Sequence, residues 1–418
     1  MRIPIVVSAF LVALLVPSRL SAQSAASQAA DLNAVRTQMD ALRADYEKAI
    51  QALQKQLDDI QAKQNAQAAA PAENVAPAAA PVQGGSVSSS KVFNPDISVT
   101  GDFLGVAGSN QVNPSPAMEM HETEVAFQAV VDPYARADFF ISFGEEGVNL
   151  EEGYVTFPTI PGGLLLKVGK MRAAFGKVNG MHNHVLPWTD RPLVTHSLLG
   201  GEDGINDAGF SVSRLIPNSV MFLEATGQVF RGDSGEDLYR SSQRGDLSYL
   251  GHLRAYKDIT ENTNLDLGFS FSQGHNAAGI VNGLDVGRFS TRLYGADGTI
   301  RWKPLQRSIY HSFVGRTEFV WSQREQFDGR QDALGYFASA DYQAARRWYL
   351  GARFDHTGRS YNASLVDKGG SATLSYFPSE FSQIRAQYRR TNYADGPTAN
   401  EVLFQFQFSI GAHGAHPF

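Results

Sequence analysis

Histidines and carboxylates gather in one segment of this chain, between residues 173 and 206. The set comprises His182, His184, His196, Glu202 and Asp203. Imidazole nitrogens and carboxylate oxygens are common ligands of Zn²⁺, so the segment is a candidate metal site. The spacing is generic, however, and a loop histidine is usually only solvated. We therefore expect no cofactor, with zinc as the alternative, and treat His413 and His416 as a second candidate pair of similar weight.

Other kinds of chemistry have little support in the sequence. The chain has no cysteine and contains neither Gly-x-Ser-x-Gly nor His-Glu-x-x-His, so we expect no enzyme. Its 36 Lys and Arg residues stand against 42 Asp and Glu residues. Nucleic-acid binding requires a basic face that releases phosphate counterions, and no basic block is present.

Strands of a barrel would position the histidine-containing segment. Val402, Phe404, Phe406 and Phe408 alternate with mostly polar residues, and similar segments of about ten residues recur from 92 to 418. This length and period are typical of a strand that crosses a membrane at a tilt. The pattern predicts an all-β fold, a transmembrane antiparallel β-barrel of about 16 strands.

The lengths of the connections favour a membrane barrel over a soluble β-sandwich. Short turns, such as 132–133 and 217–218, alternate with longer polar segments at 108–116, 173–206, 231–245, 273–287, 323–331, 357–368 and 392–398. Outer-membrane barrels have tight periplasmic turns and long extracellular loops. Trp302, Trp321 and Trp348 lie near strand ends and predict aromatic girdles at the two membrane interfaces.

If the apolar side of each strand faces lipid, charged residues of both signs face the lumen. These are Arg136, Lys167, Arg254, Arg316, Arg353, Arg385 and Arg389, with Asp138, Glu224, Asp341 and Asp355 among the acids. Rings of cations favour anions, and rings of carboxylates favour cations. Since the signs are balanced, the sequence indicates no clear ion selectivity, and many of these residues are expected to pair with one another across the lumen.

The N-terminal part predicts export and self-association. A charged start, a short apolar run and small residues at 1–22 are typical of a cleaved signal peptide. Apolar residues at heptad spacing over 31–65 predict a coiled-coil stalk, and the alternative is a single surface helix. Residues 66–91 are rich in Pro, Ala, Gly and Ser and predict a linker to the barrel at 92–418.

Two segments resemble the phosphate-selective porin O and P family of outer-membrane channels. They are Val92-Phe93-Asn94-Pro95-Asp96-Ile97 and the run from Leu166 to Gly176. The resemblance implies a homotrimer of water-filled barrels that passes small hydrophilic or ionic solutes, with the stalk in the periplasm. It also implies that the longest loop folds inward as a constriction. That loop contains Lys177, His182, His184, Trp188, Asp190, Arg191, His196, Glu202 and Asp203.

A second resemblance keeps other functions open. The segment from Met181 to Trp188 and the end containing His413 and His416 are similar to short proteins described as zinc-regulated TonB-dependent receptors. A gated receptor has 22 strands around a plug, which this length does not supply. An outer-membrane zinc uptake protein or receptor, or a structural tether, is therefore the alternative to a porin.

Overall fold

The computed structural model describes residues 95–145, 147–235 and 238–411, and before them only Lys48, Gln51 and Lys55. Contacts divide the chain into two units, Met1–Gly85 and Ser86–Phe418, and the second holds every strand described below. Within the described residues, no helix combines the length and apolar character needed to cross a bilayer. The predicted signal peptide, linker, His413 and His416 lie outside the described residues, as does the predicted stalk apart from those three residues.

The second unit consists almost wholly of β-strands. The strands are β1 (Asp96–Ser109), β2 (Met118–Asp132), β3 (Ala135–Gly144), β4 (Gly147–Ile160), β5 (Leu164–Arg172), β6 (Asn206–Leu215), β7 (Phe222–Phe230), β8 (Ser248–Thr260), β9 (Thr263–His275), β10 (Ile280–Val281), β11 (Leu284–Asp285), β12 (Ser290–Trp302), β13 (Ser312–Gln326), β14 (Gly329–Ala345), β15 (Trp348–Arg359), β16 (Asn362–Ser379), β17 (Ser382–Asn392) and β18 (Ala399–Gly411). Three short helical turns join them: η1 (Asn183–Val185), α2 (Leu193–Leu198) and η2 (Ala277–Gly279).

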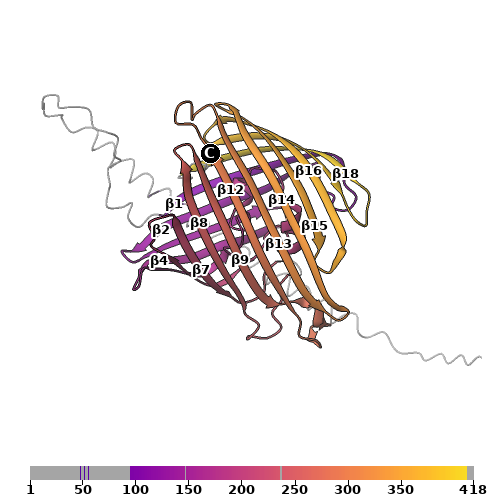
Figure 1. The fold of residues 1–418 in the computed structure, drawn as a ribbon. Coiled ribbons are helices and arrows are strands. Elements are labelled where there is room, and N and C mark those ends of the chain that lie inside the picture. Colours follow the sequence, from indigo (N-terminus) through magenta and orange to yellow (C-terminus); the bar gives the residue numbers. More distant parts are fainter. Residues whose placement is uncertain are drawn as a thin grey trace, which may run out of the picture. The chain divides into compact units, whose positions relative to one another are not determined.

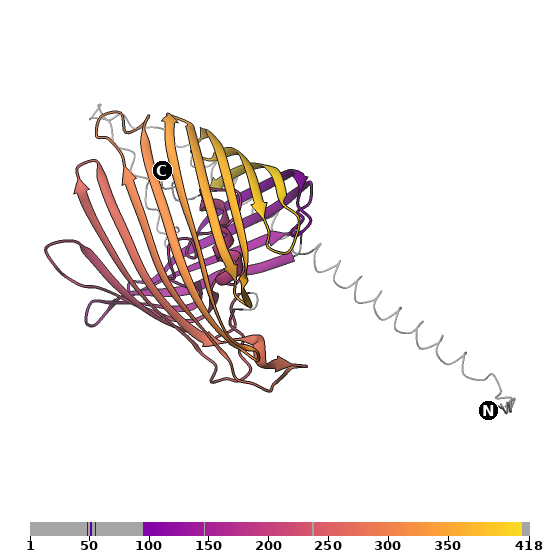
Figure 2. The ribbon, with the colours of Figure 1, turned by 45° about the vertical axis from the view of Figure 1, so that its right-hand side comes forward.

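Sixteen of these strands form one closed antiparallel barrel, and β10 and β11 form a separate small hairpin. The barrel closes where β1 pairs with β18, from Ser98 opposite Gly411 to Ser109 opposite Asn400. Figure 1 and Figure 2 show the tilted strands and the indigo start of the barrel beside its yellow end. Closure pairs every edge strand, and the expected fold class of about 16 strands is confirmed.

The two faces of the barrel are reversed relative to a soluble protein. In β18, Phe404 and Phe406 are 44% and 38% exposed on the outer face, whereas Gln405 and Gln407 are each 1% exposed. Trp302, Trp321 and Trp348 are also exposed, which agrees with their predicted places in outward-facing aromatic girdles. A soluble sandwich would bury the phenylalanines, so the outer face is suited to lipid rather than water.

Two of the expected long loops are instead tight turns. The loops predicted at 323–331 and 357–368 are wrong, because β13 continues to Gln326 before β14 begins at Gly329, and β15 continues to Arg359 before β16 begins at Asn362. Polar strand ends such as these pair by backbone hydrogen bonds without any apolar signal. The remaining long connections lie at the same end of the barrel, which we call the loop end; the opposite end is the turn end.

We predict that Phe404→Arg will destabilise the barrel by about 2–4 kcal/mol, because a guanidinium near the middle of the lipid-facing band loses its hydration. Reversible urea unfolding in lipid vesicles measures the change. Glu380→Arg, which places the same side chain in an exposed turn, is the control and should leave stability nearly unchanged. Equal effects of the two substitutions would contradict the lipid-facing assignment.

Candidate functional site

The connection between β5 and β6, residues 173–205, lies inside the barrel and is called the inner loop here. Its backbone and side chains bond to inward-facing groups on opposite walls. At one wall, Gly176 donates its N–H to Ser270 Oγ on β9 at 2.9 Å. At another, Gln407 on β18 donates to the carbonyl of His184 at 2.9 Å. The inner loop therefore crosses the lumen.

An apolar core holds one side of the inner loop to the wall. Buried loop residues pack with wall residues from β7, β8 and β12 to β14 in one cluster: Phe175, Val178, Leu186, Trp188, Val194, Leu198, Leu199 and Ile205 with Phe230, Leu250, Leu293, Val320 and Phe337. Trp188 is fully buried and meets Phe337 edge-to-face at 5.3 Å. The wall residues interrupt an otherwise polar lumen, which is a sequence signal for an inward-folded segment.

A carboxylate from the wall fixes the start of the inner loop. Glu318 on β13 is fully buried, and its Oε2 accepts the backbone N–H groups of Lys177 and Val178 at 3.0 and 3.2 Å. Gly176 makes this possible, because it adopts a positive φ of 60° and a Cβ there would overlap the Glu318 carboxylate. Lys177 then reaches Asp266 on β9 at 2.8 Å.

Asp190 fixes the middle of the inner loop by two ion pairs. Its Oδ2 lies 3.0 Å from Arg353 Nη2 on β15 and 2.9 Å from Arg389 Nη1 on β17. Burial alone would raise the pKa of Asp190, but the two guanidinium groups outweigh it and hold that pKa below its usual range. The Arg353 guanidinium also lies 4.8 Å from the centre of the Trp188 ring. These contacts keep a buried charge paired.

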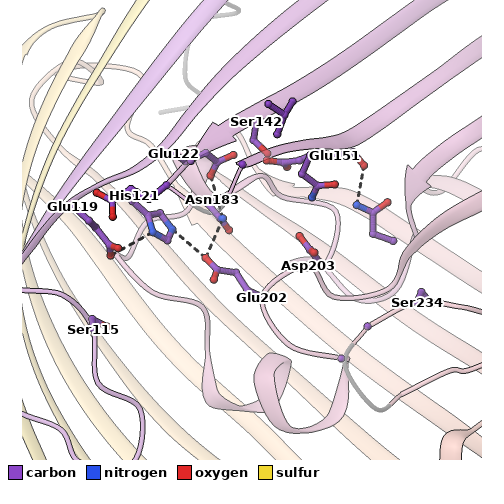
Figure 3. A pocket seen from close by; sticks show the side chains of 18 of the residues that line it. Ser115, Glu119, His121, Glu122, Ser142, Glu151, Asn183, Glu202, Asp203 and Ser234 are labelled. Carbon is purple, nitrogen blue, oxygen red and sulfur yellow. Dashed lines mark hydrogen bonds and ion pairs between the residues drawn. The ribbon is translucent and has the colours of Figure 1, made fainter. Parts of the chain in front are cut away.

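A cavity of about 1230 Å³ opens on the loop end and is strongly acidic. Its charged lining comprises Glu119, Glu122, Glu145, Glu151, Glu202, Asp203 and Asp233, against Lys170, Arg240 and His121. Figure 3 shows His121 between Glu119 and Glu202, with ring nitrogens 3.7 and 3.1 Å from their carboxylates. This concentration of carboxylates favours cations at the loop end.

A smaller cavity of about 210 Å³ lies toward the turn end and has the opposite charge. Arg301, Lys303, Arg316 and Arg385 line it, with Asp341 as the acidic partner of Arg316 at 2.6 Å. Residues 181–187, which we call the dividing segment, border both cavities: Asn183 lines the acidic one, and His184 to Pro187 line the basic one. The lumen charges are thus balanced in number but separated in space.

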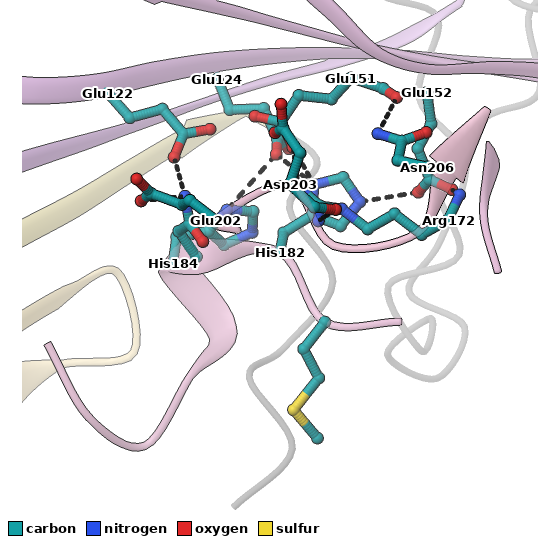
Figure 4. A network of polar contacts seen from close by, with 12 residues as sticks. Glu122, Glu124, Glu151, Glu152, Arg172, His182, His184, Glu202, Asp203 and Asn206 are labelled. Carbon is teal, nitrogen blue, oxygen red and sulfur yellow. Dashed lines mark hydrogen bonds and ion pairs between the residues drawn. The ribbon is translucent and has the colours of Figure 1, made fainter. Parts of the chain in front are cut away.

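The dividing segment carries the two histidines into a cluster of glutamates (Figure 4). His182 Nδ1 lies 2.6 Å from Glu124 on β2, and its Nε2 lies 2.8 Å from Glu152 on β4. Burial lowers the pKa of His182, but hydrogen bonds to Glu124, Glu151 and Glu152 raise it well above its ordinary value. His184 Nδ1 is 3.5 Å from the same Glu124 oxygen.

Two β-bulges bring extra charges into the lumen that strict alternation does not predict. Phe140 pairs with Glu152 and Ile141 with Leu150, so Glu151 is the additional residue and faces inward like Glu152. His121 is similarly inserted before Glu122. Bulges re-aim side chains in this way. The sequence signal for the first bulge is the pair of adjacent acids Glu151 and Glu152, because strict alternation in a membrane strand would place one of them in lipid.

Most of the other predicted lumen residues contact partners on the same or a neighbouring strand rather than across the lumen as expected. Arg136 bonds Asp138 at 3.0 Å, Arg254 bonds Asp266 at 2.8 Å, and Glu224 pairs in register with Arg254. Lys167 lies over the Tyr154 ring, and Arg353 also bonds Asp355 at 2.7 Å. Arg385 donates to the carbonyl of Leu186, and Arg389 bonds Glu401 at 2.6 Å.

The structure does not bring all the predicted metal ligands together. His196 is exposed on α2, and within the described residues it belongs to no metal-ligating group. Glu202 and Asp203 line the acidic cavity instead, and neither belongs to a metal-ligating group in the part of the chain that the structure describes. Arg191 is buried and bonds the carbonyls of Val178 and Met181, which stabilises the turn of the inner loop.

Comparisons with solved structures show the fold of outer-membrane porins. A loop L8 deletion mutant of OmpT from Vibrio cholerae is 11% identical with a TM-score of 0.50, over 76% of this chain and 99% of that one. The DcaP channel of Acinetobacter baumannii and an anion-selective porin from Comamonas acidovorans are each 10% identical with a TM-score of 0.50; both matches cover 76% of this chain, and 96% and 98% of theirs.

Sequence comparisons add a relative but no family. A protein of Aquifex aeolicus (strain VF5), described as uncharacterized, is 28% identical over 392 residues, covering 79% of this chain and 81% of that protein. No family model matches the chain.

We predict that Asp190→Asn will release the middle of the inner loop at a cost of about 2 kcal/mol, because Arg353 and Arg389 lose their shared carboxylate and keep only Asp355 and Glu401. Acrylamide quenching of Trp188 fluorescence measures the release of the loop. The Trp188→Phe variant gives the signal of the three outward-facing tryptophans, which is subtracted. Asp332→Asn, in an exposed pair with Arg330, is the matched control and should change nothing. Unchanged quenching in Asp190→Asn would contradict the docking role.

The same contact has a defined pH dependence. Since the pKa of Asp190 is depressed, its pairing stabilises the docked loop fully above the ordinary Asp pKa of about 4 and loses this effect as the pH falls through the lower folded-state value. We expect Trp188 to stay protected from acrylamide at pH 4 and to become accessible only in stronger acid. Exposure beginning between pH 6 and 5 would contradict this assignment.

Proposed function

We propose that the chain is an outer-membrane channel for passive diffusion of small hydrophilic or ionic solutes. The closed barrel with an apolar outer face and a charged lumen is the observation that carries the proposal. A lipid-facing surface needs apolar side chains, whereas a solute path needs polar groups that replace water. The role is therefore one of transport rather than catalysis or structural tethering.

Passage through the lumen is governed by the inner loop in this proposal. The dividing segment borders both cavities, so a solute that moves between them passes His182, His184 and the glutamates beside them. Carboxylates at a narrow point favour cations. We therefore assign the channel a preference for cations, although its turn-end cavity is basic.

The same proposal includes the parts of the chain outside the described residues. Both ends of the barrel, Asp96 and Gly411, lie at the turn end, since β1 and β18 pair there. In outer-membrane barrels the short turns face the periplasm. We propose that the signal peptide is removed, that the heptad segment at 31–65 lies in the periplasm, and that it associates the chains as a trimer.

Conductance of the purified full-length protein in a planar bilayer under a salt gradient tests the channel directly. We expect stepwise openings and a reversal potential on the cation-preferring side. Openings in groups of three would support the trimer. A correctly folded, heat-modifiable barrel that stays electrically silent would overturn the proposed channel.

We predict that Glu202→Gln combined with Asp203→Asn will shift the reversal potential toward anions, because both carboxylates line the acidic cavity. The measurement is the same bilayer experiment, and the effect should be largest at low salt, where screening is weak. Asp332→Asn removes a carboxylate at an exposed strand end and is the control. An unchanged reversal potential would show that the loop-end cavity does not set ion preference.

A further inference from the structure

Two sets of three potential metal ligands lie beside the dividing segment, and Glu124 on β2 belongs to both. Glu124, His182 and His184 form one set, and Glu122, Glu124 and Glu151 form the other. The ligand atoms within each set lie within 4.8 Å of one another. Ligands of a tetrahedral zinc ion lie about 3.4 Å apart, given metal–ligand bonds of about 2.0–2.1 Å, so small side-chain movements would close either set around a cation.

The cluster holds more carboxylates than its own cations neutralise. Glu122, Glu124, Glu151 and Glu152 meet there, whereas the cations beside them are Arg172, which pairs with Glu151 at 2.9 Å, and the protonated ring of His182. Glu122 is 7% exposed, and its Oε1 has no hydrogen-bond partner among the described residues. A buried carboxylate oxygen without a partner is costly. A divalent cation would supply both the missing charge and the missing contact.

The surroundings of His182 match those of a metal-binding histidine. Such a histidine usually presents one ring nitrogen to the metal and the other to a carboxylate that orients the ring. His182 Nδ1 lies 2.6 Å from Glu124, so a cation that binds this nitrogen displaces the proton held between them, while Nε2 contacts Glu152 at 2.8 Å. Glu152 is itself held in place, because its other carboxylate oxygen, Oε1, accepts the backbone N–H of Arg172 at 2.7 Å. The orienting shell is therefore already in place.

The geometry points to a binding site for a divalent transition cation at the dividing segment, with Glu124, His182 and His184 as ligands and Glu122 and Glu151 completing the set. Mixed imidazole and carboxylate ligands favour Zn²⁺ over Mg²⁺ or Ca²⁺, which prefer oxygen alone. Glu122 and Glu151 line the acidic cavity, whereas His184 lines the basic one. A cation that enters from the loop end meets the carboxylates first and then the histidines.

This inference deepens the proposed function, because it names a class of solute that the lumen retains. It does not depend on conductance, however, since binding is measurable in a silent barrel. The histidine pair was visible in the sequence, but its partners are not His196, Glu202 and Asp203. They come from β2 and β4, whose bulge at Glu151 brings two adjacent acids into the lumen.

Equilibrium dialysis of Zn²⁺ against the folded full-length protein tests the site. The background carries His413→Ala, His416→Ala and His275→Asn, which removes the C-terminal histidines and the separate group of Asp246, His275 and Asp285. We expect one zinc ion per chain at micromolar concentration and its loss in His182→Asn combined with His184→Asn. His196→Asn is the matched control within the inner loop and should bind as the background does.

Two further measurements keep the test decisive if the double variant does not fold. Glu152→Gln changes only the orienting carboxylate and should weaken zinc binding about 10–100-fold. X-ray absorption of the zinc-loaded background should show two imidazole ligands. Absence of micromolar zinc binding, or binding that is unchanged in Glu152→Gln without imidazole ligands, overturns the site. Zinc binding in a barrel without conductance would retain the site and overturn only the channel.

Discussion

The hydrocarbon interior of a membrane contains no water to satisfy a peptide group, and this constraint shapes the whole barrel. Every strand edge must pair, which the contact between β1 and β18 accomplishes. The constraint also reverses the usual arrangement of side chains: Phe404 and Phe406 point out, and Gln405 and Gln407 point in. The interior of the barrel is therefore polar, and charged side chains can lie there at a membrane depth where lipid would exclude them.

The interior is not an open tube, because the inner loop crosses it and is held by two different kinds of interaction. Apolar packing around Trp188 attaches it to β7, β8 and β12 to β14, and the ion pairs of Asp190 attach it to the neighbouring β15 and to β17. Each anchor stabilises the buried part of the other, since Arg353 contacts both Asp190 and Trp188. The dividing segment is thereby placed between an acidic and a basic compartment.

Bulges explain why the glutamate and histidine cluster forms where it does. A strand that alternates strictly presents one of two adjacent residues to the lumen, whereas the bulged residue Glu151 joins Glu152 on the inner face. The same device inserts His121 beside Glu122. The cost is a local loss of ladder pairing. The gain is a density of carboxylates that regular strands do not reach, directly opposite the histidines of the dividing segment.

The sequence alone determined the barrel, because period-two alternation in β18 and its counterparts depends only on neighbouring residues. It also indicated the inner loop by its length and named Asp190, His182 and His184. It did not show which groups they meet: Arg353 lies 163 residues from Asp190, and Glu124 lies 58 residues from His182. Only the tertiary structure separated the balanced charges into two compartments, since closure and bulges decide which distant strands become neighbours.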